Sequence, residues 1–344
     1  MKSRLVFLFS VRMLLSPSIY ASGKRPEVNL NSQKGSVSMA LGTTSPIYLD
    51  YNATTPIDPA VAAAMRPYLD GQFGNPSSSH AYGQAAKEAV EQARAQVAAL
   101  LGCAPAEVIF TSGGSESDNQ AIKGIAFARR ERGTHLITSQ IEHPAVQSTC
   151  RYLEARHGFQ VTYLPVDRDG LVDPAAVEAA ITPQTILITI MHANNEVGTL
   201  EPIAEIGQVA RRHGIAFHTD AAQSVGKVPV QVDDLGVDLL TVVGHKLYAP
   251  KGIGALYVRR GTRLDSLIHG AGHEDGRRAG TENVPYIVAL GTACALAREQ
   301  LPRFGPKERE LNRGQKTPPK KRGYNQRDGC KPVRLSKRYP HVSR

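Results

Sequence analysis

The stretches His218-Thr219-Asp220-Ala221-Ala222-Gln223 and Val243-Gly244-His245-Lys246 decide the fold prediction, because each follows an apolar run. The runs at 214–217 and 237–243 are rich in Ile, Val, Leu and Phe, which predicts two buried strands. Each predicted strand therefore ends in polar, chemically reactive side chains. Ligands of open α/β sheets gather at the carboxyl ends of the strands, so we expect Asp220, His245 and Lys246 to share one site.

Asp220 and Lys246 are the pair of side chains that a pyridoxal phosphate site requires. A carboxylate keeps the ring nitrogen of that cofactor protonated, and a lysine forms the Schiff base with its aldehyde. Each residue also has an ordinary explanation. Asp220 could be the N-cap of a helix that begins at Ala221, and Lys246 could be a solvated loop lysine.

Strand and helix patterns alternate from Ile47 to about Arg303. Apolar residues at helical spacing predict helices at 84–101, 116–132, 144–157 and 202–213. Short apolar runs predict further strands at 108–111, 135–138, 161–164, 185–191 and 253–258. This alternation predicts an α/β fold with a mostly parallel sheet covered by helices on both faces.

The segment Thr111-Ser112-Gly113-Gly114-Ser115-Glu116-Ser117 lies between a predicted strand and a predicted helix. Gly114 permits close approach of the backbone, the helix N-terminus presents free amides to an anion, and Ser115 adds a hydroxyl. These features favour a phosphate site. The alternative is an ordinary strand-to-helix turn with a serine cap.

Three further polar residues follow predicted strands. His143, in Ile141-Glu142-His143-Pro144, could stack on a flat ring and relay protons, or could simply cap a helix. Asn195 and Gln223 could hydrogen-bond a ring oxygen, although paired asparagines are also typical of turns. His273-Glu274-Asp275 lacks the spacing of a metal site and is expected to be a polar loop, so we predict no metal.

Composition restricts the class of protein. The four cysteines Cys103, Cys150, Cys294 and Cys330 are scattered, which argues against a disulfide framework or a zinc cluster and favours a reducing compartment. No apolar run approaches membrane-spanning length. The net charge is +10, but residues 311–344 carry eleven Lys and Arg against one acid, which leaves 30 basic and 30 acidic residues elsewhere. A nucleic-acid-binding surface is therefore not expected on the folded part.

These shifts in composition predict three segments. Residues 1–45, with Lys2, Arg4 and Arg12 and no acid before Glu27, form an N-terminal extension, either a transit peptide or an over-extended start with Met39 as the real one. Residues 46–305 form the cofactor-binding domain. Residues 306–344 form a basic, disordered tail. We accordingly expect a cytoplasmic protein, or a mitochondrial one if the extension is a transit peptide.

Taken together, the motifs resemble those of the cysteine desulfurases in the class V aminotransferase superfamily, which have the fold-type-I pyridoxal phosphate architecture. The similarity covers about three quarters of the chain. It is carried by segments at 48–56, 73–78, 191–198, 218–227 and 244–259.

The resemblance implies a role for each matching residue. Lys246 would form the Schiff base, Asp220 would pair with the ring nitrogen, and His143 would stack on the ring and assist proton transfer. Gln223 and Asn195 would bond the ring hydroxyl and its surroundings. The residues that would hold the phosphate are Gly114, Ser115 and His245, with Thr281 reaching the phosphate of the partner subunit in a homodimer.

The resemblance also implies a reaction: removal of sulfur from L-cysteine to give L-alanine and an enzyme persulfide, which is passed to a sulfur acceptor or an iron–sulfur scaffold protein. Two departures are visible. Val243 stands where the family often has a serine, which removes one phosphate hydroxyl. After Glu310 the chain leaves the family pattern, and the small C-terminal domain, with its cysteine loop and carboxylate-binding arginine, is largely missing.

Cys330, which has basic neighbours, is not expected to replace that cysteine, because a nucleophile must be held in geometry. The simplest explanation is a truncated or frame-shifted desulfurase, whose activity in this form the sequence leaves open. Two alternatives remain open: a selenocysteine lyase or other class V enzyme, and a cofactor-binding pseudoenzyme whose basic tail is an interaction segment.

Overall fold

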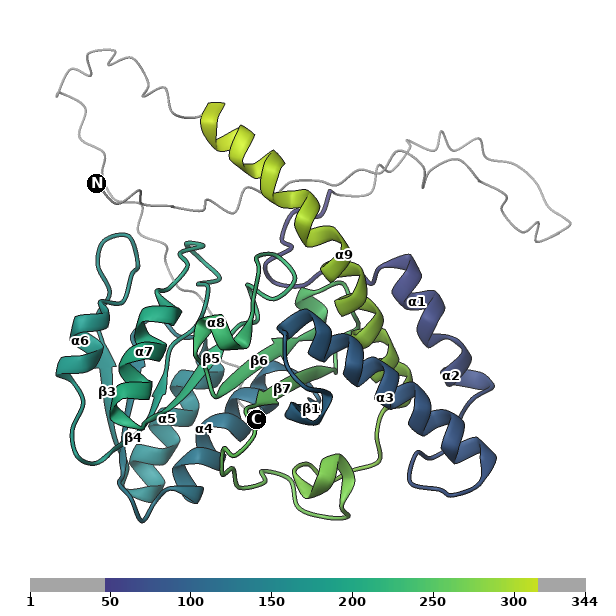
Figure 1. Cartoon of the computed structure of the whole chain (residues 1–344), viewed down its shortest axis with the longest axis horizontal. Helices are drawn as coiled ribbons and strands as arrows, with labels where there is room; N and C mark the ends of the chain where they lie inside the picture. Colours follow the sequence, from purple (N-terminus) through teal and green to yellow (C-terminus); the bar gives the residue numbers. More distant parts are fainter. Residues whose placement is uncertain (1–46, 315–344) are drawn as a thin grey trace, which may run out of the picture. The chain divides into compact units, whose positions relative to one another are not determined.

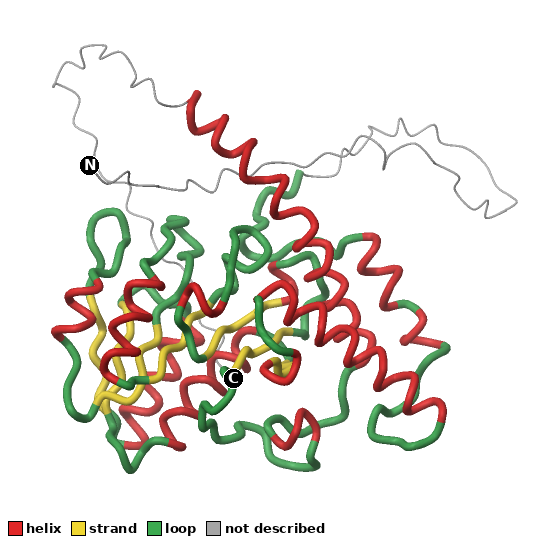
Figure 2. Tube along the Cα trace, in the orientation of Figure 1, coloured by secondary structure: helices red, strands yellow, loops and turns green. Residues whose placement is uncertain are grey.

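The computed structural model describes residues 47–314 (Figures 1 and 2). Its centre is a seven-stranded sheet with the order β1-β7-β6-β5-β4-β2-β3. The strands are β1 Val108–Thr111, β2 His135–Ser139, β3 Gln160–Leu164, β4 Thr185–Thr189, β5 Ala216–Asp220, β6 Leu239–Val243 and β7 Gly254–Val258. The predicted extension at 1–45, the tail beyond residue 314 and Cys330 lie outside the described residues.

Six of the seven strands run in one direction. β3, β2, β4, β5 and β6 pair in parallel, whereas β7 is antiparallel to both β6 and β1. β1 therefore points the same way as β6, and the carboxyl ends of all strands except β7 meet at one edge. The predicted mostly parallel sheet is confirmed.

Helices cover both faces of the sheet, as predicted. The helices are α1 Pro59–Met65, α2 Pro67–Asp70, α3 Ala81–Leu101, α4 Gly114–Ala128, α5 Pro144–His157, α6 Pro174–Ala179, α7 Ile203–His213, α8 Val232–Leu235 and α9 Val284–Gly314, with 3₁₀ turns η1 Pro105–Glu107, η2 Gly244–Lys246 and η3 His273–Gly276. α4 and α5 enclose one apolar core, and α3, α7 and the first part of α9 enclose the other. A sheet covered on both sides explains why six of the strands are buried along their whole length.

Local sequence explains where several helices begin and end. The Asp58 carboxylate accepts a hydrogen bond from the amide of Ala60 and caps α1, and His80 caps α3 in the same way. α3 ends at Gly102 and α5 ends at Gly158, each in the left-handed conformation that glycine adopts readily. The structure thus begins α3 at Ala81 rather than at the predicted residue 84.

The strand predicted at 214–217 needs correction. β5 instead runs from Ala216 to Asp220, so His218 and Thr219 lie inside the sheet. Their polar atoms are satisfied there, because His218 bonds the hydroxyls of Thr189 and Thr241 and Thr219 donates to the carbonyl of Ile190. Asp220 is still the last residue of its strand.

α9 extends from Val284 to Gly314, so the predicted domain boundary at residue 305 falls inside a helix. Its side chains are described only as far as Leu301, and the buried apolar ones, among them Ile287, Leu290 and Cys294, belong to the core beside α3. None of the helices in residues 47–314 has both the length and the apolar character to cross a membrane.

Candidate cofactor site

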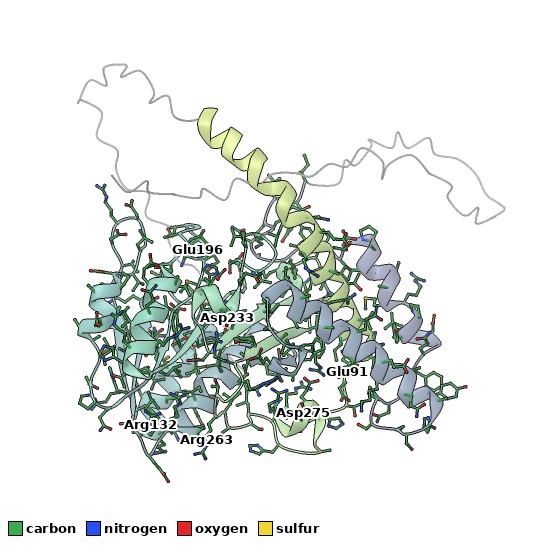
Figure 3. The ribbon with its side chains drawn as sticks, viewed as in Figure 1. Glu91, Arg132, Glu196, Asp233, Arg263 and Asp275 are labelled. Atoms are coloured by element: carbon green, nitrogen blue, oxygen red, sulfur yellow. The ribbon has the colours of Figure 1, made fainter. Side chains whose placement is uncertain are left out.

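The reactive residues predicted from sequence lie at the carboxyl edge of the sheet. Asp220 ends β5, His245 and Lys246 form the turn after β6, and Gly114 and Ser115 begin the helix after β1. In Figure 3, Glu196, which follows β4, and Arg132, which precedes β2, lie at opposite edges of the sheet. The site lies at the edge near Glu196.

Three of these side chains lie close together at this edge of the sheet: Lys246, Asp220 and His143. Side-chain atoms of His143 and Asp220 lie within 4.8 Å of each other, and the charge of Lys246 acts on Asp220. Burial raises the pKa of Asp220, although the amide of Ala222, His143 and Lys246 oppose that shift. Burial likewise lowers the pKa of Lys246, so a larger fraction of this amine is neutral than in a solvated lysine.

His143 and Asp220 also have the capping contacts that were the alternative explanation. The His143 Nδ1 atom accepts a hydrogen bond from the amide of Ala145 at the start of α5. The Asp220 Oδ1 atom accepts one from the amide of Ala222 at 2.9 Å. These bonds leave Nε2 of the imidazole and the other oxygen of the carboxylate for a ligand, so the two explanations are compatible.

Gly113 and Gly114 form a cradle at the N-terminus of α4. Gly113 has φ 145°, which favours glycine, and nothing lies within 4 Å of the position of an added β-carbon. The amides of the first turn of α4 have no acceptor within the helix, and the Ser115 side chain is exposed beside them. The cradle has the features of an anion site.

Asn52 is a site residue that the sequence analysis did not assign. Its carbonyl oxygen accepts hydrogen bonds from Lys246 Nζ and from Gln223 Nε2. The adjacent Thr54 and Thr55 hydroxyls bond His245, through its Nδ1 and its carbonyl oxygen respectively. The segment 48–56 was recognised only through the family resemblance, and no local pattern predicted these contacts over nearly 200 residues of sequence.

The side chains predicted to contact the cofactor ring, Asn195 and Gln223, differ in their hydrogen-bond partners. Gln223 is buried beside Asn52, and its Oε1 accepts a bond from Lys227. The Asn195 amide donates to Glu196 at 2.6 Å and is directed to a neighbouring residue. Asn194 makes the turn expected of paired asparagines, since its Oδ1 accepts from the amides of Glu196 and Val197.

Two buried acids beneath the site were also missed. Asp118 of α4 is 1% exposed, and burial together with Asp220 raises its pKa well above the usual range. Glu142 is 4% exposed, and burial raises its pKa to about 8. Its Oε1 accepts from the hydroxyl of Ser139 and the amide of Met191, and so fixes the turn that presents His143. Only the tertiary fold places these acids next to the site.

The segment 273–275 is not a plain polar loop. It forms the 3₁₀ turn η3, and Glu274 makes two bonds of 2.7 and 2.9 Å to the buried guanidinium of Arg94. The Phe110 amide also donates to Glu274. The following Arg278 bonds Glu116 at 2.8 Å, which connects this loop to the cradle. Thr281 is exposed on the same loop.

The described cysteines have no activated thiol. Cys150 and Cys294 are completely buried, and Cys103 is half-buried. Burial raises the pKa of each thiol to about 12. Because the thiolate is the nucleophile, none of these three is suited to attack sulfur.

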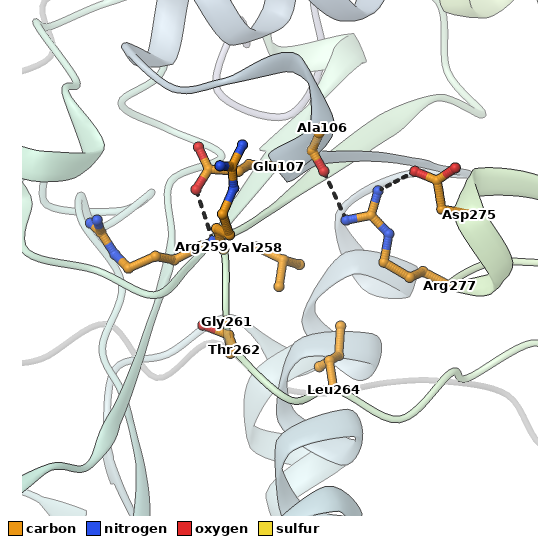
Figure 4. A pocket seen from close by; sticks show the side chains of 10 residues that line it. Ala106, Glu107, Val258, Arg259, Gly261, Thr262, Leu264, Asp275 and Arg277 are labelled. Carbon is orange, nitrogen blue, oxygen red and sulfur yellow. Dashed lines mark hydrogen bonds and ion pairs between the residues drawn. The ribbon is translucent and has the colours of Figure 1, made fainter.

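A hollow of about 320 Å³ lies away from the site (Figure 4). It is lined by residues at 258–262, the end of β7, which runs opposite to its neighbours and so ends at the other edge of the sheet. Its Arg277 already bonds the carbonyl of Ala106 and the carboxylate of Asp275. This hollow contains none of the predicted site residues.

Comparison with known proteins agrees with the fold and the motifs. The family model "Aminotransferase class-V" matches residues 47–310. A cysteine desulfurase IscS of Dictyoglomus turgidum is 55% identical over 251 residues, which are 73% of this chain and 64% of that protein. A mouse cysteine desulfurase is 52% identical over 259 residues, which are 74% of this chain and 56% of that protein. The chain thus spans less than two thirds of the length of these curated relatives.

Solved structures give the same result. SspA in complex with cysteine superposes with a TM-score of 0.70 at 48% identity and covers 77% of each chain. A NifS-like protein superposes with a TM-score of 0.75 at 39% identity, covering 78% of this chain and 74% of the other.

Proposed function

Because this chain belongs to the class-V aminotransferase family, we propose that it binds pyridoxal phosphate at the carboxyl edge of its sheet and is a cysteine desulfurase acting on L-cysteine. Enzymes of this family depend on pyridoxal phosphate. The curated relatives named above support the substrate, and the residues at the sheet edge support the cofactor.

The observation that carries the proposal is Lys246 beside Asp220 at the ends of adjacent strands. Burial lowers the pKa of the Lys246 amine, and the charge of Lys246 acts on the buried carboxylate of Asp220. The cradle at Gly113 leaves open space next to free helix amides, which suits a phosphate. The three parts lie at one edge and match the aldehyde, the ring nitrogen and the phosphate of the cofactor.

We assign each residue the task that the family resemblance implies for it. Lys246 would attach to the cofactor and, once displaced by the substrate amine, could carry a proton. Asp220 would hold the ring nitrogen, and His143, with its free Nε2, would lie over the ring. Gly114, Ser115 and His245 would bind the phosphate, and Gln223 and Asn195 would bond the ring hydroxyl. The bound cofactor supplies an electron sink for the carbanion formed at the substrate.

The sulfur-accepting thiol would come from outside the three described cysteines, whose pKa values are raised. The persulfide formed would be passed to a sulfur acceptor or an iron–sulfur scaffold protein.

We further propose a homodimer in which Thr281 reaches the partner's phosphate. A cytoplasmic location fits the scattered cysteines, with the mitochondrion as the alternative. The selenocysteine lyase and pseudoenzyme alternatives have no observation in their favour.

Addition of pyridoxal phosphate to the purified protein tests the site directly. We expect a visible absorption band, and after borohydride treatment a peptide that carries the cofactor on Lys246. Lys246→Ala should lose both. The comparison variant is Lys227→Ala. Burial lowers the pKa of Lys227 to about 8, so this amine could also react with the cofactor aldehyde. Attachment at Lys227, or an unchanged adduct in Lys246→Ala, would refute the assignment.

Release of alanine and sulfide from L-cysteine tests the reaction separately. We expect alanine formation to require both the cofactor and Lys246. A protein that binds the cofactor but forms no alanine from L-cysteine, even with an added thiol as sulfur acceptor, would refute the desulfurase proposal and leave the cofactor site standing.

A further inference from the structure

A second carboxyl lies directly behind Asp220. Asp118, on the face of α4 that packs on the sheet, is 1% exposed, and its side-chain oxygen lies within 4.8 Å of that of Asp220. Its Oδ1 has no hydrogen-bond partner among the described residues and lies 3.7 Å from His218 Nε2. Two carboxylates this close and this buried repel each other strongly, so the pair retains a proton.

The surroundings of the two carboxyls differ in a way that decides which one holds the proton. Asp220 has the amide of Ala222 as a donor, and the charges of His143 and Lys246 favour its anion. Asp118 is acted on by Asp220 and Glu142, which oppose its ionisation, and only a hydroxyl, that of Thr241, favours it.

His218 lies beside Asp118 but is neutral, so it does not stabilise an ionised Asp118. It is completely buried, and burial lowers its pKa to about 3. Both ring nitrogens are engaged by hydroxyls, Nδ1 with Thr189 at 2.8 Å and Nε2 with Thr241 at 3.1 Å. A neutral imidazole therefore lies next to Asp118, and ionisation of Asp118 would leave an uncompensated buried charge.

We propose that Asp118 is a positioning residue: it holds the single proton of the Asp118–Asp220 pair, so that Asp220 is kept as the anion that faces the cofactor. The inference rests on the proposed function only for the role of Asp220. Asp118 itself touches neither cofactor nor substrate. The amide of Ala222 donates to one oxygen of Asp220, which leaves the other oxygen to face the cofactor.

Infrared spectroscopy of the full chain without cofactor tests the protonation directly. Protein labelled with ¹³C at the aspartate side-chain carboxyl should show, at neutral pH, a protonated-carboxyl band that shifts with the label. The label excludes Glu142. The band should disappear in Asp118→Asn and remain in Asp238→Asn, which removes another aspartate whose pKa burial raises. Labelled wild type without such a band, or a band that persists in Asp118→Asn, would overturn the proposal.

Cofactor affinity tests the positioning role. Asparagine keeps a neutral polar side chain beside Asp220, so Asp118→Asn should bind pyridoxal phosphate within about threefold of wild type. Asp118→Leu places an apolar side chain there, which favours the neutral form of Asp220, and the dissociation constant should rise roughly tenfold. Binding to Asp118→Leu should recover as the pH rises, because Asp220 then loses its proton.

Equal loss of affinity in Asp118→Asn and Asp118→Leu would show a purely structural residue and overturn the positioning role. If Asp118→Leu does not fold, the labelled wild-type protein still decides the protonation. Failure of wild type to bind the cofactor would count against the proposed function, whereas the infrared result does not depend on binding.

Discussion

The Val243 Cγ2 atom lies 2.6 Å from the position that a β-carbon on Gly114 would occupy. The last residue of β6 and the first residue of α4 are therefore in close contact at the sheet edge. Only a glycine allows this approach, because any other residue at 114 would overlap the valine. The contact places the cradle directly beside the turn that carries His245 and Lys246.

Gly114→Ala should weaken cofactor binding. The added methyl group must displace Val243 or the first turn of α4, and either movement misaligns the amides that would hold the phosphate. We expect the dissociation constant for pyridoxal phosphate to rise by roughly tenfold, the loss of about one hydrogen bond to a charged group. Gly272→Ala is the matched control, since no atom lies within 4 Å of its added β-carbon. Equal affinity of the two variants would contradict this role of Gly114.

Val243→Ser should strengthen cofactor binding. The serine hydroxyl would lie next to the cradle, where related enzymes often have one, and could donate to the phosphate. A net hydrogen bond of about 1 kcal/mol corresponds to an affinity roughly fivefold higher. Val243→Ala removes the same methyl groups without adding a hydroxyl and should show no gain. If serine and alanine give the same dissociation constant, the hydroxyl does not reach the phosphate.

Glu274→Gln should destabilise the fold. The substitution leaves the Arg94 guanidinium buried, with only 9% of its side chain exposed, and without its buried carboxylate partner. Loss of one member of a buried ion pair costs about 3–5 kcal/mol in the free energy of unfolding. Glu91 pairs with the same arginine but is 53% exposed, so Glu91→Gln should cost less than about 1 kcal/mol. Urea unfolding of both variants measures the difference, and comparable small losses would show that the buried pair contributes little.

Much of the fold was predictable because its signals are local. The strand at 108–111 and the helix at 144–157 were placed at their observed bounds, because an apolar run marks the strand and a first-turn proline and a following glycine mark the helix. The polar residues at the strand ends were found for the same reason: the order of the parallel strands does not matter, because their carboxyl ends meet at one edge.

The residues that were missed depend on tertiary contacts. Asn52 acts through its backbone carbonyl, which no side-chain pattern reveals. Glu274 was assigned to a polar loop because its partner Arg94 lies 180 residues earlier in the chain. Asp118 is an acid in the middle of an amphipathic helix, and sequence alone does not show that this face lies on Asp220 rather than in solvent.

Glu142 should make the stability of the protein fall as the pH rises. Burial raises its pKa from 4.5 to about 8, so the folded state holds a proton that the unfolded state releases above about pH 4.5. Between these two values folding takes up that proton, and the free energy of unfolding decreases by up to about 1.4 kcal/mol per pH unit. The loss ends near pH 8, where the folded state also releases the proton.

Glu142→Gln should remove this contribution. Its amide oxygen can still accept from Ser139 and Met191, so the turn before α5 is kept while the titration is lost. The slope of the unfolding free energy against pH, measured by urea unfolding between pH 5 and 8, should become less negative by about one proton. Burial also raises the pKa of Glu201 to about 7, but Glu201 is present in both proteins. Its contribution to the slope therefore cancels when the two slopes are subtracted. The exposed Glu88→Gln on α3 is the control, and parallel curves for wild type and Glu142→Gln would show that Glu142 is ionised in the folded protein.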